Sequence, residues 1–139
     1  MVDNYNIKLL GFAIGGLLIG TICFYDDVKG APAFVKLMVQ IIAATVVYKA
    51  GIRIDNITIP FVTWDFNVWF YRILTVGWIV GITNAINLID GLDGLSTGVS
   101  LIACISLSII FALNGSPLLS IILVTALAGA LVGFLPFNF

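Results

Sequence analysis

The sequence has no histidine, few charged residues and only two cysteines among its 139 residues. Without histidine, the chain supplies no imidazole for catalysis or for metal binding. Charged residues make up 9% of the chain, whereas ordinary soluble domains have about 25%, and so small a soluble protein could not bury this much apolar surface. The net charge of -1 and the lack of charge runs exclude a basic surface for nucleic acid. These shortages favour lipid as the solvent of the chain.

The two cysteines, Cys23 and Cys104, lie inside apolar runs, and their spacing matches no metal site. Each is predicted to pack as a small hydrophobic residue rather than to form a disulfide or bind a metal. The first four residues lack the basic region and the cleavage site of a signal peptide. The first apolar run is therefore expected to remain as a membrane span.

Hydrophobic residues account for 61% of the chain and gather in long runs. A bilayer core of about 30 Å requires roughly 20 apolar residues in a helix, and about 17 are tolerated. The runs predict an all-α integral membrane protein, a bundle of about five transmembrane helices in one domain, 1–139. The predicted spans are Ile7–Tyr25, Ala33–Ala50, Phe70–Asn87, Leu95–Leu113 and Leu118–Leu135.

Two local patterns add detail to this bundle. Between the second and third spans, the alternation of apolar and polar residues in Ile52–Trp69 predicts a short strand or hairpin at the membrane interface. Trp64 and Trp69 would suit the headgroup region. The first span has small residues at spacings that allow close helix packing: Gly11, Gly15, Gly16 and Gly20.

Asp26 and Asp27 close the first predicted span, where adjacent carboxylates oppose the negative end of the helix dipole. At an effective dielectric constant near 20, like charges about 4 Å apart repel by roughly 4 kcal/mol. A divalent cation, a lysine or a shared proton would offset this repulsion, and a solvated capping pair is the alternative. Lys36 enters the second span, where it either binds phosphate or extends to the interface.

A second polar cluster closes the third span. Asn84, Asn87 and Asp90 are spaced by three and fall within a roughly 120° arc of one helix side. Because a charge at the bilayer centre costs about 2.5–3.5 kcal/mol, these groups are predicted to line a polar cavity. The Asp-Gly-Leu-Asp-Gly loop that follows, 90–94, can turn close to a ligand, and it lacks the EF-hand pattern. A simple capping turn is the alternative.

Odd-numbered spans end on the same membrane face, so the two clusters and Asn138 are predicted to share one face. The distribution of lysine and arginine does not decide which face is cytoplasmic. Carboxylates with a lysine suit a hard cation and phosphates, because Mg²⁺ takes one or two carboxylates together with phosphate oxygens. Such a site promotes phosphoryl-type transfer by aligning the reacting oxygens.

At these residues the sequence resembles the polyprenyl-phosphate N-acetylhexosamine-1-phosphate transferases, which start teichoic acid, O-antigen and peptidoglycan lipid intermediates. The family's Asp-Asp motif matches Asp26 and Asp27, and its downstream lysine matches Lys36. Its asparagine-rich loop and the start of its next motif match the other candidates, Asn84, Asn87, Asp90, Asp93 and Asn138. Ile86 and Ile89 favour the N-acetylglucosamine branch, since muramyl-pentapeptide enzymes tend to have threonines there.

The resemblance implies transfer of N-acetylglucosamine-1-phosphate from UDP-N-acetylglucosamine to undecaprenyl phosphate, with release of UMP, at the cytoplasmic face of the bacterial inner membrane. It implies catalysis by Asp26, Asp27, Asp90 and Asp93. It implies substrate binding by Lys36, Asn84, Asn87 and Asn138. It also implies Mg²⁺, or Mn²⁺ in its place, held by Asp26, Asp27 and Asp90.

The sequence departs from the family in its extent. Family members have about twice as many helices, and this chain ends before the family's Met-Gly-Asp metal motif and its histidine-containing loop. The chain is therefore expected to be a fragment that is inactive alone. The implied partners are a UDP-sugar, a polyprenyl phosphate and the bilayer, without nucleic acid, and a homodimer remains open.

Two functions of other classes also remain open. A small ion transporter or channel subunit would place its acidic side chains near the middle of the bilayer, on broken helices. An inert structural bundle would need none of these side chains. The acidic residues here gather at predicted helix ends, which favours the transferase.

Overall fold

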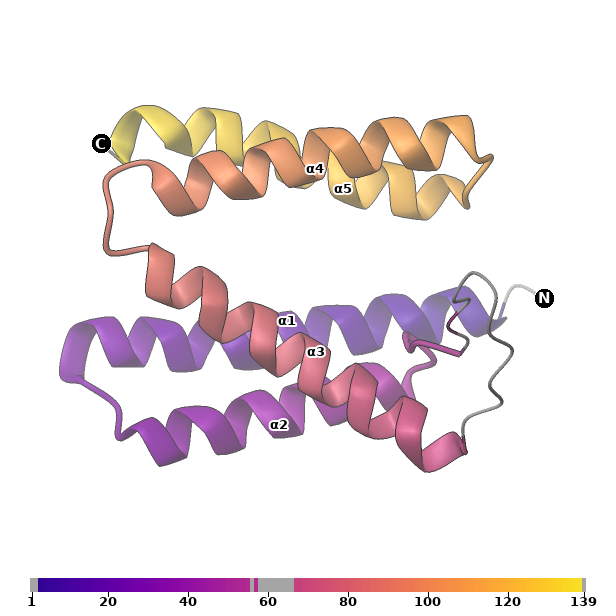
Figure 1. The fold of residues 1–139 in the computed structure, drawn as a ribbon, viewed down its shortest axis with the longest axis horizontal. Helices are drawn as coiled ribbons and strands as arrows, with labels where there is room; N and C mark the ends of the chain where they lie inside the picture. The colour runs from indigo at the N-terminus through magenta and orange to yellow at the C-terminus, as the bar shows by residue number, and fades with distance from the viewer. Residues whose placement is uncertain (1–2, 56, 58–66, 139) are drawn as a thin grey trace. The chain divides into compact units, whose positions relative to one another are not determined.

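The computed structural model describes residues 3–55, 57 and 67–138, with side chains from Tyr5 onward. These residues form helices, turns and irregular segments, which confirms the predicted all-α membrane class. The helices are α1 (Asp3–Lys29), α2 (Ala33–Lys49), α3 (Val68–Ile89), α4 (Leu95–Leu113), α5 (Leu118–Phe134) and the short 3₁₀ helix η1 (Leu135–Phe137), shown in Figure 1. The chain divides into two compact units, Met1–Thr83 and Asn84–Phe139, and each is described by itself.

In the described part of the chain, four helical segments are long and apolar enough to cross a membrane: Tyr5–Lys29, Val68–Ile89, Leu95–Leu113 and Leu118–Phe137. The protein is thus a multi-pass membrane protein. The prediction for α4 was correct to the residue, whereas α1 extends the predicted Ile7–Tyr25 by four residues at each end. α2 has 17 residues, which is the lower limit for crossing a bilayer.

In the first unit, α1 and α2 form an antiparallel hairpin (Figure 1). A Cβ atom added to Gly11 would lie 2.1 Å from the Cβ of Ala50, and one added to Gly15 would lie 2.5 Å from Cγ2 of Val47. Helices can approach this closely only where a side chain is missing, so the predicted packing of the small residues is confirmed at these two positions. The other two glycines have no described atom within 4 Å of an added Cβ: Gly16 and Gly20.

The hairpin also defines how far α2 extends beside α1. Its contacts run from Ala50 beside Gly11 at one end to Lys36 beside Asp26 at the other. The 15 residues of α1 between these contacts rise by about 22 Å. α2 thus accompanies α1 over most of a membrane thickness, but it is not among the four described segments that are long and apolar enough to cross, whereas the sequence predicted about five crossings.

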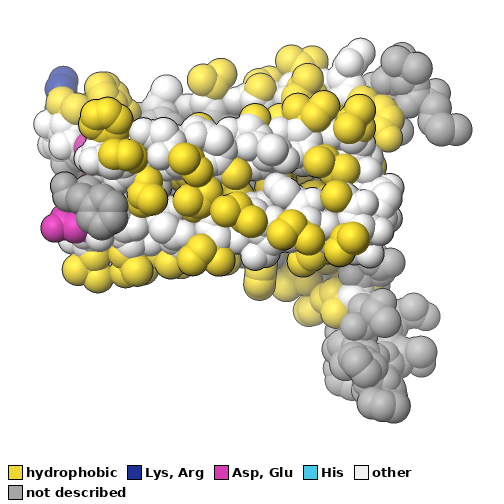
Figure 2. All heavy atoms as spheres, turned by 90° about the horizontal axis from the view of Figure 1, so that it is seen from above, with side chains coloured by type: hydrophobic (Ala, Val, Ile, Leu, Met, Phe, Trp, Pro, Cys, Tyr) yellow, Lys and Arg dark blue, Asp and Glu magenta, His cyan; other side chains and the backbone are white. Residues whose placement is uncertain are grey.

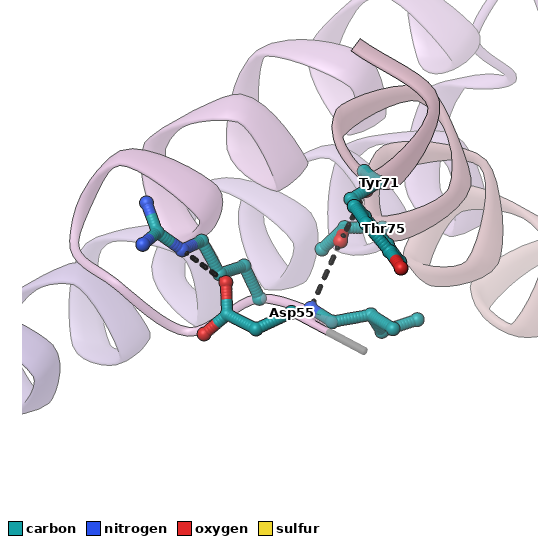
Figure 3. A network of polar contacts seen from close by, with 5 residues as sticks. Asp55, Tyr71 and Thr75 are labelled. Carbon is teal, nitrogen blue, oxygen red and sulfur yellow. Dashed lines mark hydrogen bonds and ion pairs between the residues drawn. The ribbon is translucent and has the colours of Figure 1, made fainter. Parts of the chain in front are cut away.

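After α2, the described residues 52–55 and 57 take no strand conformation, which corrects the predicted interfacial strand for this part of the segment. The backbone N–H of Ile54 donates to Oγ1 of Thr75 (3.1 Å) instead of to a strand partner, and this hydroxyl donates to the carbonyl of Tyr71 (2.7 Å), as Figure 3 shows. Position 56 and positions 58–66, including Trp64, lie outside the described residues. The hydroxyl of Thr75 on α3 therefore accepts the hydrogen bond of a backbone N–H that the alternating pattern had assigned to a strand.

In the second unit, α4 and α5 form another antiparallel hairpin, joined by a turn at 114–117. The hydroxyl of Thr125 on α5 donates to the Oγ of Ser108 on α4 (3.4 Å). After α5, Pro136 lies in the first turn of η1, and the chain then meets the start of α4. There the N–H of Gly94 donates to the carbonyl of Asn138 (2.5 Å).

Burial in this protein is the reverse of burial in a soluble domain. Among the described residues, the buried side chains are small or polar: Ala43, Ala44, Cys104, Ala128, Gln40, Thr75, Ser96 and Thr97. Large apolar side chains face outward on every helix, and Figure 2 shows them over much of the visible face. Lipid tails are as apolar as leucine, so small residues rather than large ones pack membrane helices together. Both cysteines are free, and Cys104 packs as predicted.

Candidate functional site

Asp26 lies in the last turn of α1 and connects the two helices of the first hairpin. Its Oδ2 accepts a hydrogen bond from Nζ of Lys36 (2.6 Å), which lies in the first turn of α2. Its Oδ1 accepts a hydrogen bond from the backbone N–H of Ala31 (2.8 Å) in the connecting loop. One carboxylate thus binds both the loop and the second helix.

These contacts explain why a carboxylate is tolerated at the negative end of a helix. The ammonium of Lys36 and the N–H of Ala31 offset the unfavourable dipole at Asp26. The side chains of Lys36 and Asp26 are 13% and 25% exposed, so water screens the pair only in part. Asp27, one residue further along the helix, is exposed to solvent.

The structure therefore gives the two adjacent aspartates different surroundings. The carboxylate of Asp26 is engaged by protein donors, whereas that of Asp27 is open at the end of α1. Of the three partners that the sequence left open for this pair, a divalent cation, a lysine or a shared proton, the structure shows a lysine, and it contacts Asp26.

In the second unit, Asp90 is the first residue after α3 and begins the loop that leads to α4. The hydroxyl of Ser96, in the first turn of α4, donates to Oδ1 of Asp90. Ser96 and its neighbour Thr97 are buried, at 5% and 4% exposure. The buried hydroxyl of Ser96 therefore connects the two ends of the loop and orients the carboxylate of Asp90.

Gly94 gives this loop its turn. Its φ of 68° lies in the left-handed region, and it forms the N-cap of α4. The carbonyl of Gly94 accepts from the N–H of Gly98 (2.9 Å), and its own N–H donates to the carbonyl of Asn138. A left-handed residue at a helix start suits glycine, which has no Cβ to clash with the backbone. The prediction that glycine turns the loop is confirmed at this position.

Through this hydrogen bond, Asn138 lies beside the 90–94 loop. The count of spans predicted that these residues, which belong to the same unit, share one membrane face. Its side-chain amide nitrogen Nδ2 is buried and has no hydrogen-bond partner among the described residues. A buried donor without a partner costs about 1–3 kcal/mol. This donor therefore remains free, within the described part of the chain, to bind an acceptor such as a phosphate oxygen.

The remaining candidates of this unit lie nearby in sequence. Asn84 and Asn87 are half-buried on the last turns of α3, and Asp93 is exposed in the loop. Both asparagines precede Asp90 at intervals of three, so α3 presents them on one side. No acidic candidate lies in the middle of a helix, which disfavours an ion pathway through the bilayer.

The donor set limits what metal the described residues could hold. They contain no group of three histidine, cysteine, aspartate or glutamate residues placed to bind one ion. A site enclosed by protein ligands alone is one way in which proteins bind a divalent cation. The exposed carboxylates Asp27 and Asp93 suit the other mode, in which Mg²⁺ is held by one or two carboxylates and by substrate phosphate.

Comparison with known proteins decides the family of this chain. The model of the family described as "Glycosyl transferase family 4" matches residues 9–139. The chain belongs to glycosyl transferase family 4. The matched residues include every candidate of both clusters, so the resemblance inferred from the sequence is confirmed.

Several curated members of glycosyl transferase family 4 are similar to the chain. A probable undecaprenyl-phosphate N-acetylglucosaminyl 1-phosphate transferase from Bacillus subtilis is 38% identical over 95% of this chain and 37% of its own length. A phospho-N-acetylmuramoyl-pentapeptide-transferase from Staphylococcus epidermidis is 38% identical over 99% of this chain and 47% of its own length. A protein of the latter name from Lacticaseibacillus paracasei is 37% identical over 88% of this chain and 41% of its own length.

The chain spans less than half the length of these curated relatives. No solved structure matches the chain. The family is shown by its sequence, and the geometry of the site comes from this structure alone.

Sequence reasoning missed one residue of the site. Ser96 was not a candidate, although its hydroxyl holds Asp90 and its side chain is buried. A hydroxyl residue at the start of a helix, a few positions after an acidic loop residue, is a weak sign of such a contact. The hydroxyl of a serine near a helix start often bonds to nearby backbone groups, so the sequence could not show that this one would donate to Asp90.

Proposed function

We propose that the chain is part of a longer membrane enzyme that transfers N-acetylglucosamine-1-phosphate from UDP-N-acetylglucosamine to undecaprenyl phosphate. The observation that carries this proposal is the family match over residues 9–139, which includes both clusters of acidic and amide residues. The placement of these clusters at helix ends gives it physical support, because a phosphate carried by a membrane lipid lies at the depth of the headgroups.

In the proposed reaction, a phosphate oxygen of undecaprenyl phosphate attacks the β-phosphorus of the UDP-sugar. The new P–O bond joins an oxygen of the lipid phosphate to the β-phosphorus, and the bond from the β-phosphorus to the oxygen that bridges the two phosphorus atoms of UDP breaks. UMP leaves with that bridging oxygen. The protein has to position two anionic groups and lower the repulsion between them.

The two clusters would divide this work. Lys36 would hold phosphate, with its ammonium oriented by Asp26. Asp27, which is exposed, would lie nearest to the attacking phosphate and could take its proton. Asn84, Asn87 and the buried amide of Asn138 would bind the nucleotide-sugar. Asp90 and Asp93 would face the same substrate from the 90–94 loop.

Magnesium, or manganese in its place, is part of the proposal. Asp27, Asp90 and Asp93 would supply one or two carboxylates, and Asp26 would contribute only if its contact with Lys36 opened. When bound with substrate phosphate, the ion would neutralise charge on the phosphates during transfer.

The choice of N-acetylglucosamine as donor sugar rests on Ile86 and Ile89 and on the name of the Bacillus subtilis relative. The identity values do not separate the donors, because the relative named for a muramoyl-pentapeptide donor is also 38% identical. We further propose that the active face is cytoplasmic, in the inner membrane of a bacterium, where nucleotide sugars are made. UDP-N-acetylmuramoyl-pentapeptide is the second donor to test.

The experiment is exchange of labelled UMP with UDP-N-acetylglucosamine in membranes that contain the whole protein carrying this chain, with undecaprenyl phosphate present. We expect exchange that requires a divalent cation and the lipid phosphate. Asp90→Asn should reduce the exchange rate by at least about a hundredfold, because a positioned carboxylate is lost.

Asn114→Ser, in the exposed turn between α4 and α5, is the control and should keep the wild-type rate. Full exchange in Asp90→Asn would reject the role of that carboxylate. Exchange with the muramoyl-pentapeptide donor alone would correct the sugar, and no exchange with any UDP-sugar would overturn the reaction itself.

A further inference from the structure

A basic and aromatic cluster lies at the end of the α1–α2 hairpin away from Asp26. The guanidinium carbon of Arg53 is 5.9 Å from the centroid of the Tyr48 ring, and that of Arg72 is 5.8 Å from the same centroid. Arg72 is also 5.4 Å from the centroid of the Trp69 ring. One tyrosine at the end of α2 thus meets two cations, one from the segment after α2 and one from the first turns of α3.

The two guanidinium groups are neutralised to different degrees. Nε of Arg53 donates to Oδ1 of Asp55 (2.6 Å), as Figure 3 shows for the labelled carboxylate. Within the described residues, no carboxylate pairs with Arg72, whose contacts are the faces of Tyr48 and Trp69. A guanidinium that stacks on aromatic rings keeps its N–H donors at its edge, where they can bind an anion.

Further cations lie at the same end of the hairpin. Lys49 is the last residue of α2 and is exposed, and a Cβ atom added to Gly51 would lie 3.4 Å from Cε of Lys8. Like charges that gather without enough carboxylates repel one another unless an anion joins them. Among the described side chains of this cluster, the positive charges outnumber the negative charges, so binding of an anion would stabilise it.

A small pocket accompanies these charges. It has a volume of about 230 Å³ and is lined by Tyr48, Arg53, Asp55, Val68 and Tyr71. Pockets for drug-sized ligands usually measure about 300–1,000 Å³, so this pocket suits a compact head group rather than a nucleotide. Arg53 in the lining is paired with Asp55, whereas Arg72 lies outside the lining on the ring of Tyr48, and a phosphate group has a size that fits beside it.

The surroundings identify the source of that phosphate. Val68 begins the membrane-spanning part of α3, and Val68 and Trp69 are 64% and 62% exposed. Tryptophan and tyrosine at the end of a span lie at headgroup depth. A free phosphate ion would leave these apolar surfaces uncovered, whereas the acyl chains of a phospholipid would lie along them.

We propose that Tyr48, Arg53 and Arg72 form a binding site for the phosphate of an anionic phospholipid, with Arg72 as the main donor. This site is separate from the proposed transferase site, since it lies at the opposite end of the hairpin from Asp26 and Lys36. Arginine forms paired hydrogen bonds with phosphate oxygens, and Tyr48 holds the guanidinium groups in place.

The test is native mass spectrometry of the full chain in detergent, titrated with phosphatidylglycerol or with phosphatidylcholine. We expect the wild type to bind phosphatidylglycerol more tightly. Arg72→Gln should weaken that binding roughly fivefold or more, as one lost cation near a lipid surface would. Arg53→Gln should weaken it less, because Asp55 already neutralises that residue.

The matched control is Lys29→Gln, which removes a cation that lies over a single ring, that of Tyr25, at 5.8 Å. It should leave the preference for phosphatidylglycerol unchanged. Equal binding of both lipids by the wild type, or full binding by Arg72→Gln and Arg53→Gln, would overturn the proposal. Inorganic phosphate is added as a competitor, and the melting temperature of the protein is measured with each ligand. If inorganic phosphate displaces phosphatidylglycerol and raises the melting temperature as much as phosphatidylglycerol does, the site binds free anions and the lipid assignment is wrong. Sugar transfer is not measured, so either result leaves the proposed reaction untouched.

Discussion

Nζ of Lys36 lies 2.6 Å from Oδ2 of Asp26, and this contact joins the end of α1 to the start of α2. The two residues are ten positions apart, and the loop between them is held to the same carboxylate by the N–H of Ala31. The pair has two consequences for the site. It fixes the direction of the ammonium that would meet a phosphate, and it leaves Asp27 as the open carboxylate of the pair of aspartates.

The first prediction concerns this ion pair. Asp26→Asn and Lys36→Gln should each lower the melting temperature of the protein in lipid nanodiscs, because each leaves the other partner half-buried without its counter-charge. The double variant should lose less than the sum of the two single losses, since both changes remove the same contact. The coupling should weaken as salt is raised. Strictly additive losses would contradict a direct interaction, and Lys29→Gln provides the control for removal of an exposed lysine.

The second prediction concerns the hydroxyl that holds Asp90. Ser96→Ala should lower the free energy of unfolding by about 1 kcal/mol, because the carboxylate of Asp90 loses a buried donor. In the whole enzyme, the exchange rate should fall more than the affinity for UDP-N-acetylglucosamine, since the carboxylate would lose its orientation. Ser106→Ala is matched to it, because the hydroxyl of Ser106 donates only to the carbonyl of Ile102 in its own helix. If both variants had the same rate, Ser96 would have no positioning role.

The third prediction separates two faces of α1. Gly11→Ala should destabilise the hairpin by about 1–3 kcal/mol, because the new methyl group would lie 2.1 Å from the Cβ of Ala50. Gly20→Ala meets no described atom within 4 Å and should be neutral or stabilising by up to about 1 kcal/mol. Unfolding of each variant by sodium dodecyl sulfate in mixed micelles measures both changes. A loss of the same size in the two variants would show that α1 packs differently.

The fourth prediction compares two glycines at the start of α4. Gly94→Ala should cost about 1–2 kcal/mol, because a φ of 68° places a Cβ too close to the backbone. The change should also disturb the N–H that donates to Asn138, and with it the 90–94 loop. Gly98→Ala, one turn into the same helix, has no described atom within 4 Å and should be tolerated. Thermal unfolding of both variants checks the sign, and an unchanged midpoint for Gly94→Ala would argue against the left-handed turn.

Most of the helical framework could be predicted from the sequence. Long apolar runs lie in lipid only as helices, because backbone groups there have no water to satisfy them. This reasoning correctly placed α4 at Leu95–Leu113. It missed the ends of α1 by four residues, where polar residues extend the helix beyond its apolar part, and the ends of α3 by two, and it ended α2 and α5 one residue too late. The prediction of a strand after α2 was wrong for the described residues 52–55 and 57. The alternating pattern there fits a strand, but the hydroxyl of Thr75 satisfies the N–H of Ile54.

The sequence by itself determined the solvent of this protein, the positions of its long apolar runs and the residue types that could do chemistry, since composition and run length follow directly from it. Only the tertiary structure decided which side chains meet. Gly11 and Gly20 look alike in a stripe of small residues, yet only Gly11 packs against α2. Asp26 and Asp27 are neighbours, yet only Asp26 bonds to Lys36. These choices depend on distances of a few ångströms between helices, and the sequence of one helix does not contain the position of another.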